Sequence, residues 1–198
     1  MTRMWLLFPL PQDLTVCSLR FFHCLPKSMK RKPSGWNLVY RQSMMTPESL
    51  HEAALLMRLF KKSLFALHAL SIKVIVHLIL GLPHETREMM SASVQAIANL
   101  PVWGIKLQLL HVLSGTDLAA YYEKTHFPVF SMDEYCEMII DCLELLPPEM
   151  VIHRITGDGP KDLLIAPMWS TGKRTVLNQI HRRLKERNTY QGRLATKR

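Results

Sequence analysis

The chain has 198 residues, a length that suits one ordinary domain and leaves room only for a small second one. Because 48% of the residues are hydrophobic, a buried core is expected and disorder of the whole chain is not. The longest apolar stretch, residues 74–82, contains His77 and is far too short to cross a bilayer, so we expect no membrane contact and a cytoplasmic location.

The net charge of +9 is carried by the two ends of the chain. Lys and Arg dominate residues 1–72 and 169–198, whereas acidic residues outnumber them in residues 73–168. Basic ends can attract RNA or an acidic partner. A solvated basic helix face followed by a tail explains the same pattern, and both interpretations stay open.

The four cysteines, Cys17, Cys24, Cys136 and Cys142, form no Cys-x-x-Cys pair. This excludes a zinc knuckle and a thioredoxin-type site, and no metal ligands are expected. Cys142 lies on an apolar helical stripe and is expected to be a core residue. In the cytoplasm all four are expected to be free thiols.

The first half of the predicted fold begins with a helix that ends near Leu70. Residues 73–80 are apolar on both faces, as in a central strand of a parallel sheet, and Gly81 and Pro83 end the strand. Thr86 caps a helix that runs to about Leu100. A second strand follows at residues 105–112, and then a short helix at residues 116–124.

The second half predicts a long helix, a third strand and a last helix. Ser131 caps the long helix, which Pro147 and Pro148 end. Residues 150–155 form the third strand. The last helix, residues 170–187, is expected to turn apolar residues inward and basic residues outward; the outward set is Arg174, Arg182, Arg183 and Lys185.

This alternation predicts an α/β fold with right-handed crossovers and a parallel sheet, either a piece of a barrel or a small open sheet. Ligands bind at the carboxyl ends of such strands, where Gly81, His111 and Arg154 fall together. Each has two interpretations. Gly81 serves a tight turn or a ligand contact, His111 is a core histidine or a ligand contact, and Arg154 pairs with Asp158 or binds an anion.

Five segments of the sequence resemble one protein family. They are HLILGLPHET (77–86), GIKLQLLHVLSGT (104–116), LLPPEMVIHRITGDGP (145–160), APMWS (166–170) and YQG (190–192). The stretch is similar to small bacterial radical S-adenosylmethionine (SAM) proteins of the YhcC/YtqA type, relatives of the radical SAM domain in the elongator catalytic subunit. It covers about three-fifths of the chain.

The resemblance implies a partial (β/α) barrel, of which residues 61–168 would form roughly the C-terminal half. It also implies SAM and a [4Fe-4S] cluster as cofactors, although this sequence contains no Cys-x3-Cys-x2-Cys motif to hold the cluster. The family's Gly-x-Ile-x-Gly-x-x-x-Glu motif maps onto His77, Ile79, Gly81 and Glu85, with His77 in place of the first glycine. The implied SAM-contacting residues are Ile79, Gly81, Leu82, Pro83, His111 and Leu113, and the candidate substrate face comprises His153, Arg154 and Asp158.

Residues 1–60 resemble nothing in the family and are expected to be irregular. Shifting the frame of the codons permits family-like motifs near Pro11–Cys17 and Gly35–Arg41, so a frameshift upstream of residue 60 is our hypothesis for this segment. Without a native partner, the strand at residues 73–80 would lose its sheet neighbour and expose an apolar edge.

The sequence therefore predicts a radical SAM family protein, truncated of its cluster loop and inactive alone, that acts on an unknown substrate. The alternative function is a small basic α/β module that binds RNA or an acidic partner through residues 169–198, a basic helix and tail. A third interpretation, no function at all, follows from the frameshift hypothesis.

Overall fold

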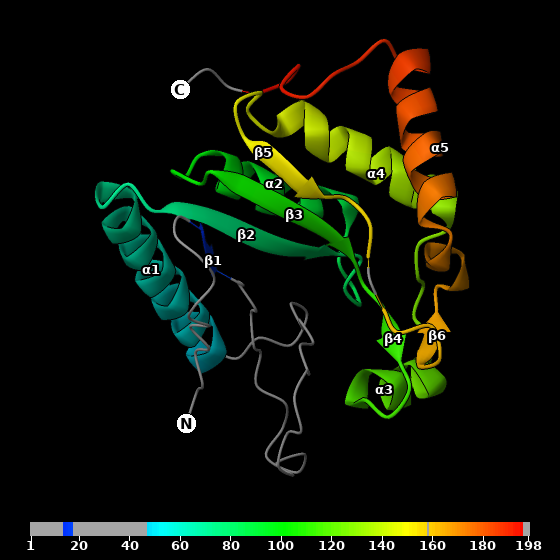
Figure 1. Ribbon diagram of the computed structural model, residues 1–198. Coiled ribbons are helices and arrows are strands. Elements are labelled where there is room, and N and C mark those ends of the chain that lie inside the picture. The colour runs from blue at the N-terminus through cyan, green and yellow to red at the C-terminus, as the bar shows by residue number, and fades with distance from the viewer. Residues whose placement is uncertain (1–13, 18–46, 158, 196–198) are drawn as a thin grey trace.

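The computed structural model of the chain describes residues 14–17, 47–157 and 159–195, and side chains from Met57 onward. Its main feature is a sheet of four parallel strands in the order β1-β2-β3-β5 (Figure 1). These strands are β1 Leu14–Cys17, β2 Lys73–Leu80, β3 Gly104–Leu109 and β5 Val151–Arg154. The mixed α/β class and the parallel sheet predicted from the sequence are confirmed.

Five α-helices connect the strands of the described chain. They are α1 Pro47–Ala69, α2 Arg87–Ala98, α3 Asp117–Thr125, α4 Met132–Leu145 and α5 Lys173–Glu186. Thr86 caps α2 and Ser131 caps α4 in a full capping box with Glu134, as the sequence predicts. Helix α1 begins within the segment 1–60 that was expected to be irregular; the frameshift hypothesis itself falls mainly on residues outside the described ones.

The core lies between the sheet and helices α2 and α4 (Figure 1). Alternation along the strands points Val74, Val76, Ile105 and Leu107 toward these helices, where all four are buried. Val176 and Ile180 place one face of α5 in the same hydrophobic cluster. The C-terminal segment 169–198 therefore shares its core with the preceding residues.

Two predictions about the strands are wrong. Strand β2 does not lose its neighbour, because β1 pairs with it in parallel from Leu14↔Lys73 to Cys17↔Val76. The predicted strand 105–112 ends at Leu109 because the chain leaves the sheet there. A two-residue strand, β4 Val112–Leu113, then pairs antiparallel with β6 Leu164–Ala166.

Helix α5 is held against α4 by arginine–carboxylate pairs. Arg183 binds Glu137 and donates from Nη2 to Asp133 Oδ1 at 2.5 Å. Arg187 Nη1 donates to Glu137 and Asp141, each at 2.9 Å. The expectation that Arg183 points outward is therefore wrong, because the acidic side of α4 faces it.

Glu144 anchors the far end of this contact and is only 5% exposed. Its carboxylate accepts hydrogen bonds from Arg187 Nη2 at 3.2 Å and from the Thr189 hydroxyl, and Arg193 lies 3.6 Å away. A buried carboxylate is stable only with such partners. All three partners follow the last residue of α5, so the segment after this helix is fixed to α4.

No helix among the described residues combines the length and the apolar character needed to cross a membrane.

We predict that Glu144→Gln lowers the free energy of unfolding by about 1–3 kcal/mol, because the amide cannot satisfy all the donors around a buried carboxylate. Urea unfolding followed by circular dichroism measures the change. The control is Glu186→Gln, whose carboxylate pairs with Arg182 on the exposed side of α5; there the change should stay within about 0.5 kcal/mol. Equal effects of both substitutions would contradict the anchoring role of Glu144.

Candidate functional site

The carboxyl ends of β2 and β3 meet at one edge of the sheet. Leu80 pairs with Leu109 at the end of the ladder, and the Leu110 amide donates to the Leu80 carbonyl at 3.0 Å. The two segments that follow, Gly81–Pro83 and His111–Leu113, therefore start side by side. Of the three residues that the sequence places together, Gly81 and His111 meet at this edge. Arg154 does not, because it pairs with Lys106, before the end of β3.

Glu85 holds the turn after β2. Its Oε2 accepts hydrogen bonds from the backbone amides of Gly81 and Leu82, each at 3.1 Å. Burial raises the pKa of the Glu85 carboxyl, and the two amides oppose that rise. The two backbone amides at the strand end are thus already paired. A ligand at this edge would therefore contact side chains rather than these two donors.

Gly81 is required by its backbone angle and by a neighbouring ring. Its φ of +82° is one that residues with a side chain rarely adopt. A Cβ at this position would come within 2.8 Å of Phe130 Cδ2. The indole of Trp169 donates to the Phe130 carbonyl at 2.8 Å and so fixes the segment that carries the ring. These observations support the tight-turn interpretation, and the ligand contact of Gly81 stays a prediction.

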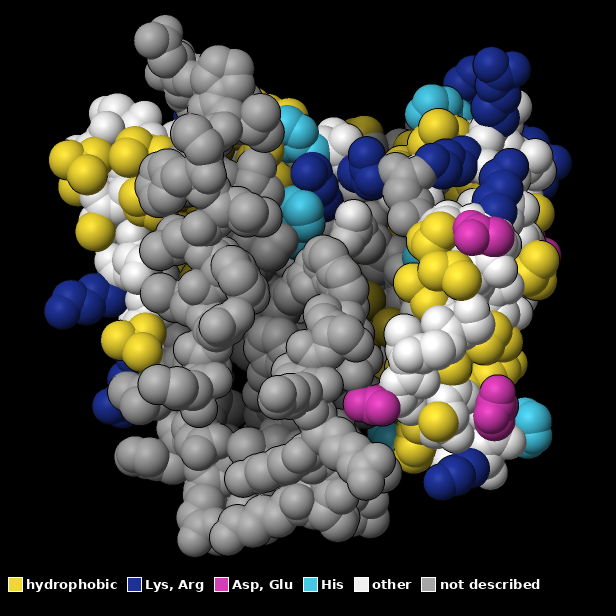
Figure 2. All heavy atoms as spheres, turned by 60° about the horizontal axis from the view of Figure 1, so that its bottom comes forward, with side chains coloured by type: hydrophobic (Ala, Val, Ile, Leu, Met, Phe, Trp, Pro, Cys, Tyr) yellow, Lys and Arg dark blue, Asp and Glu magenta, His cyan; other side chains and the backbone are white. Residues whose placement is uncertain are grey.

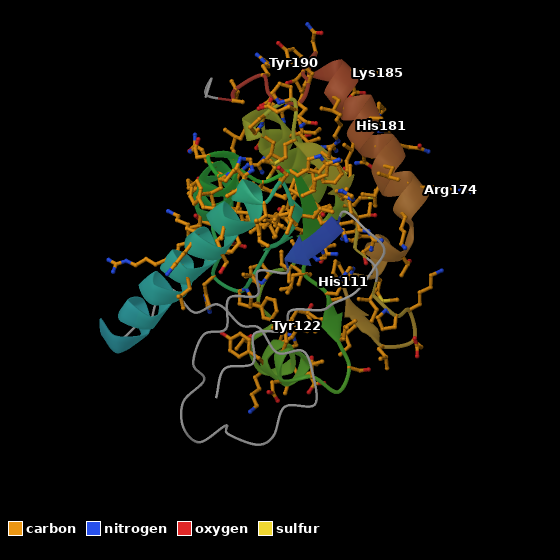
Figure 3. The ribbon with its side chains drawn as sticks, turned by 60° about the vertical axis from the view of Figure 1, so that its left-hand side comes forward. His111, Tyr122, Arg174, His181, Lys185 and Tyr190 are labelled. Atoms are coloured by element: carbon orange, nitrogen blue, oxygen red, sulfur yellow. The ribbon has the colours of Figure 1, made fainter. Side chains whose placement is uncertain are left out.

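His111 is tied to the start of the C-terminal helical region. Its Nε2 lies 2.9 Å from Ser170 Oγ, and Ser170 Oγ donates its own proton to the Pro167 carbonyl at 2.8 Å. Because the hydroxyl has one proton, Nε2 must be the donor in this pair, which assigns the neutral tautomer of His111. Burial lowers the pKa of the imidazole. Figure 3 shows His111 at the end of the sheet nearer to α3.

Two glycines of the loop after β5 lie against the His111 ring. A Cβ on Gly157 would fall 1.9 Å from His111 Cε1, and one on Gly159 would fall 3.4 Å from Cγ. The loop can approach the imidazole this closely only because Gly157 has no side chain. His111 is therefore a packed, hydrogen-bonded histidine, as the core interpretation holds.

The remaining predicted contact residues form an apolar surface around this edge. Ile79 and Leu82 pack on a second hydrophobic cluster, which consists of Leu110, Val112, Leu118, Ala119, Phe127 and Ala166. Pro83 is buried. Leu113 lies beside the position that a Cβ of Gly159 would take, at 3.5 Å. The structure thus groups all six predicted SAM-contacting residues at one edge, without testing the contact itself.

The candidate substrate face lies on β5, away from this edge. His153 is exposed and Arg154 is half-buried, while Asp158 is outside the described residues, so the proposed Arg154–Asp158 pair is untested. Both residues line a groove of about 560 Å³ between β5, α4 and α5. Apolar residues such as Ile152, Leu177 and Leu184 form the rest of its wall.

Sequence reasoning missed Phe130, Ser170 and the groove. Phe130 reaches the site from a distant part of the chain, and no local pattern marks it. Ser170 belongs to the family-like segment APMWS, but that segment gives no sign of its partner His111, which lies 59 residues away. Gly157 carried a signal in the segment TGDGP, because clustered glycines often mark a close backbone approach.

The described part of the chain contains no group of three or more His, Cys, Asp or Glu residues that could hold a metal ion. Cys136 and Cys142 are buried free thiols, which confirms the core position predicted for Cys142. Burial raises the pKa of both, that of Cys142 to about 12. A thiol must lose its proton to bind iron, so neither residue suits a cluster.

Residues 102–186 match the family model of the radical SAM C-terminal domain. YtqA of Bacillus subtilis is 50% identical over 121 residues, which are 61% of this chain and 38% of that protein. Protein MJ0486 of Methanocaldococcus jannaschii is 32% identical over 126 residues, 63% and 39% of the two chains. YhcC of Escherichia coli K12 is 30% identical over 115 residues, 58% and 37% of the two chains.

Among solved structures, the chain resembles the archaeal Methanocaldococcus infernus Elp3 with an N-terminal deletion. The TM-score is 0.52 and the sequence identity 18%, over 61% of this chain and 28% of that one. This likeness concerns the fold. The chain spans less than two-fifths of the length of the curated relatives given above.

We predict that His111 makes stability depend on pH. Since the folded pKa lies below the ordinary 6.5, the unfolded chain binds the proton first as the pH falls. The contribution of His111 to the free energy of unfolding is therefore complete above about pH 6.5. It is lost as the pH falls from that value to the folded pKa, with a slope of at most about 1.4 kcal/mol per pH unit.

Urea unfolding of the wild type and of His111→Gln at pH values from about 5 to 8 measures this effect. The difference between the two curves should vary in that window. His181→Gln, which removes an exposed imidazole of α5, is the matched control for the substitution itself. Parallel curves for wild type and His111→Gln would refute the assignment.

Proposed function

Because this chain is related to the C-terminal part of radical SAM proteins, we propose that it forms the carboxyl-terminal half of a partial β/α barrel and one wall of a SAM site. The observation that carries the proposal is the meeting of Gly81–Pro83 and His111–Leu113 at the carboxyl edge of a parallel sheet. Ligands of α/β proteins bind at such edges. The family model begins at residue 102 and so includes β3 and His111.

The proposed contacts are mainly apolar. The amides of Gly81 and Leu82 are used by Glu85, and His111 Nε2 is used by Ser170. A nucleoside would therefore rest on the side chains of Ile79, Leu82 and Leu113. SAM, when bound to a complete radical SAM protein, supplies the adenosyl group for radical chemistry.

The described residues do not fit an iron–sulfur cluster. The whole sequence lacks a Cys-x3-Cys-x2-Cys motif, and Cys136 and Cys142 are buried on α4 with raised pKa values. We therefore assign no redox step to these residues. We propose that this polypeptide alone is inactive as a radical SAM enzyme and that its substrate binds elsewhere than the adenosyl wall, with His153 and Arg154 as candidate contacts.

A second proposal is binding of RNA or an acidic partner through the basic face of α5. Arg174 and Lys185 are exposed along this helix, together with His181 (Figure 3). The pairing of Arg183 and Arg187 with α4 carboxylates reduces the charge available to such a partner. This proposal therefore has less support than the first.

We predict that the 198-residue chain binds no stoichiometric [4Fe-4S] cluster. Anaerobic reconstitution with iron and sulfide, followed by iron analysis and ultraviolet–visible spectroscopy, should give far less than four iron atoms per chain. Thiolates are the ligands that such a cluster needs. A stable brown product with four iron and four sulfide per chain would overturn this prediction.

We further predict weak SAM binding by the same chain, with a Kd on the order of 1 mM, because only part of a site is present. Leu82→Ala should weaken it about five-fold, the effect of losing roughly 1 kcal/mol of apolar contact. Equilibrium dialysis with labelled SAM measures both. The matched control is Leu194→Ala, which changes an exposed leucine. Absence of binding by folded wild type, or equal Kd values for all three proteins, would reject the SAM wall.

A further inference from the structure

We propose that the groove between β5, α4 and α5 binds an extended, acidic segment of another protein, which adds to the sheet as a strand beside β5. The bound segment alternates apolar side chains, turned toward the helices, with acidic side chains, turned toward solvent. This proposal rests on the second function proposed above, binding of an acidic partner at α5, and names the form of that partner. It does not involve the SAM wall, which lies at the carboxyl ends of β2 and β3.

Strand β5 leaves one backbone edge open. In the order β1-β2-β3-β5 it pairs only with β3 among the described strands. The Val151 amide donates to the Trp103 carbonyl at 3.0 Å, so it points toward the side of β3. Successive residues of a strand direct their N–H and C=O groups to opposite sides, and those of Ile152 therefore point away from β3. An edge of this kind is a template for another strand.

Helix α5 lies beyond this open edge. Helices α2 and α4 cover the sheet itself, whereas α5 runs beside β5, on the side away from β3 (Figure 1). The groove of about 560 Å³ separates the two, with Ile152 on the strand side, Leu177 on the α5 side and Leu143 contributed by α4. The groove therefore occupies the place of the next strand of the sheet, with a helix already present on its far side.

Two leucines of α5, Leu177 and Leu184, form an apolar wall of the groove, called here the leucine wall. They lie about two turns apart and so share one face of the helix. The neighbouring face carries Val176 and Ile180, which belong to the main hydrophobic cluster. Both leucines are only half-buried. The leucine wall is thus available to apolar side chains at alternate positions of an added strand.

Basic side chains border the leucine wall. At helical spacing Arg174, His181 and Lys185 fall next to it on the side away from α4, and all three are exposed along α5 (Figure 3). Figure 2 shows Lys, Arg and His side chains gathered in the upper right of the molecule, around α5. In the described part of the chain, none of these three takes part in an ion pair, unlike Arg183 and Arg187. No described residue that lines the groove is Asp or Glu, so the groove is complementary to an acidic segment.

The same features disfavour two other occupants. A second copy of this chain, paired through β5, would bring the basic borders of two grooves together. A single-stranded nucleic acid would match the charge, but it needs aromatic rings for base stacking. Among the described residues that line the groove, the only rings are those of His153 and His181. An open strand edge beside an apolar wall is the arrangement that a polypeptide strand uses.

Binding of a synthetic peptide tests the proposal. The probe is the fluorescein-labelled peptide Glu-Val-Glu-Val-Glu-Val-Glu, titrated with the full chain and followed by fluorescence anisotropy. Wild type should bind it with a Kd on the order of 0.1 mM, and Leu177→Gln should weaken binding at least about five-fold. The matched control is Leu70→Gln, which changes an exposed leucine next to α1 and should bind as wild type does. Failure of wild type to bind, or equal binding by folded Leu177→Gln, would overturn the site.

Hydrogen exchange at β5 reports whether the peptide pairs as a strand. The Ile152 amide should exchange at least about ten-fold more slowly in the saturated complex, because its N–H gains an acceptor. The Val151 amide, which already donates to Trp103, is the internal control. Nuclear magnetic resonance follows both amides. Unchanged exchange at Ile152 would contradict strand addition.

Methylated peptides give an independent check on the same pairing. One version of the probe carries N-methyl groups on its valines, and another carries them on its glutamates. Because alternate amides of a strand point to opposite edges, and only one edge meets β5, at least one version should bind more weakly by about five-fold or more. If both versions bind as the parent peptide does, the peptide is not an added strand and the proposal fails.

Charge substitutions separate this proposal from the broader function on which it rests. Lys185→Gln should weaken peptide binding and reduce its dependence on salt, and Lys124→Gln of α3, also an exposed lysine, is the control. If Lys185→Gln weakens binding but Leu177→Gln does not, α5 binds acidic partners by charge alone. The strand proposal then fails while the second function stands.

Two further results would assign the groove to another occupant. If a single-stranded oligonucleotide of mixed sequence binds and the peptide does not, the partner is nucleic acid and the proposal is wrong. If neither probe binds, the second function fails as well. Analytical ultracentrifugation of the free chain tests the remaining case, since a dimer that Leu177→Gln dissociates would give the groove to a second copy.

Discussion

The contact between α4 and α5 is the constraint on which the rest of this architecture depends. The arginines at α5 would repel a basic neighbour, but α4 presents carboxylates at helical spacing. Glu144 is the last of these carboxylates along α4, and it is buried. Helix α5 is thereby fixed beside β5. Its position determines where Ser170 meets His111 at one end and where the groove beside β5 opens along its length.

Much of the fold could be predicted because its elements carry strong patterns. The apolar run KVIVHLIL matches β2 to the residue, since Gly81 ends it, and the capping residues Thr86 and Ser131 mark their helices correctly. Strands β4 and β6 could not be predicted, because two or three residues show no periodicity. The outward direction predicted for the Arg183 side chain is wrong, because that direction depends on the charge of a different helix.

The candidate site could be predicted from the sequence only in part, for the same reason. The grouping of Gly81 with His111 follows from parallel strands, which a sequence pattern reveals. The partners of these residues do not follow, because Phe130 and Ser170 come from other elements and meet them only in the folded chain.

The hydrogen bonds at the carboxyl edge differ greatly in the length of chain they close. Glu85 reaches Gly81 across four residues, whereas Ser170 reaches His111 across 59. Short loops close early and at small entropic cost, while long ones wait for the intervening chain to order. On a ribosome, the turn after β2 can form as soon as it emerges. The imidazole must wait for the segment before α5, so this edge is completed in two stages during synthesis.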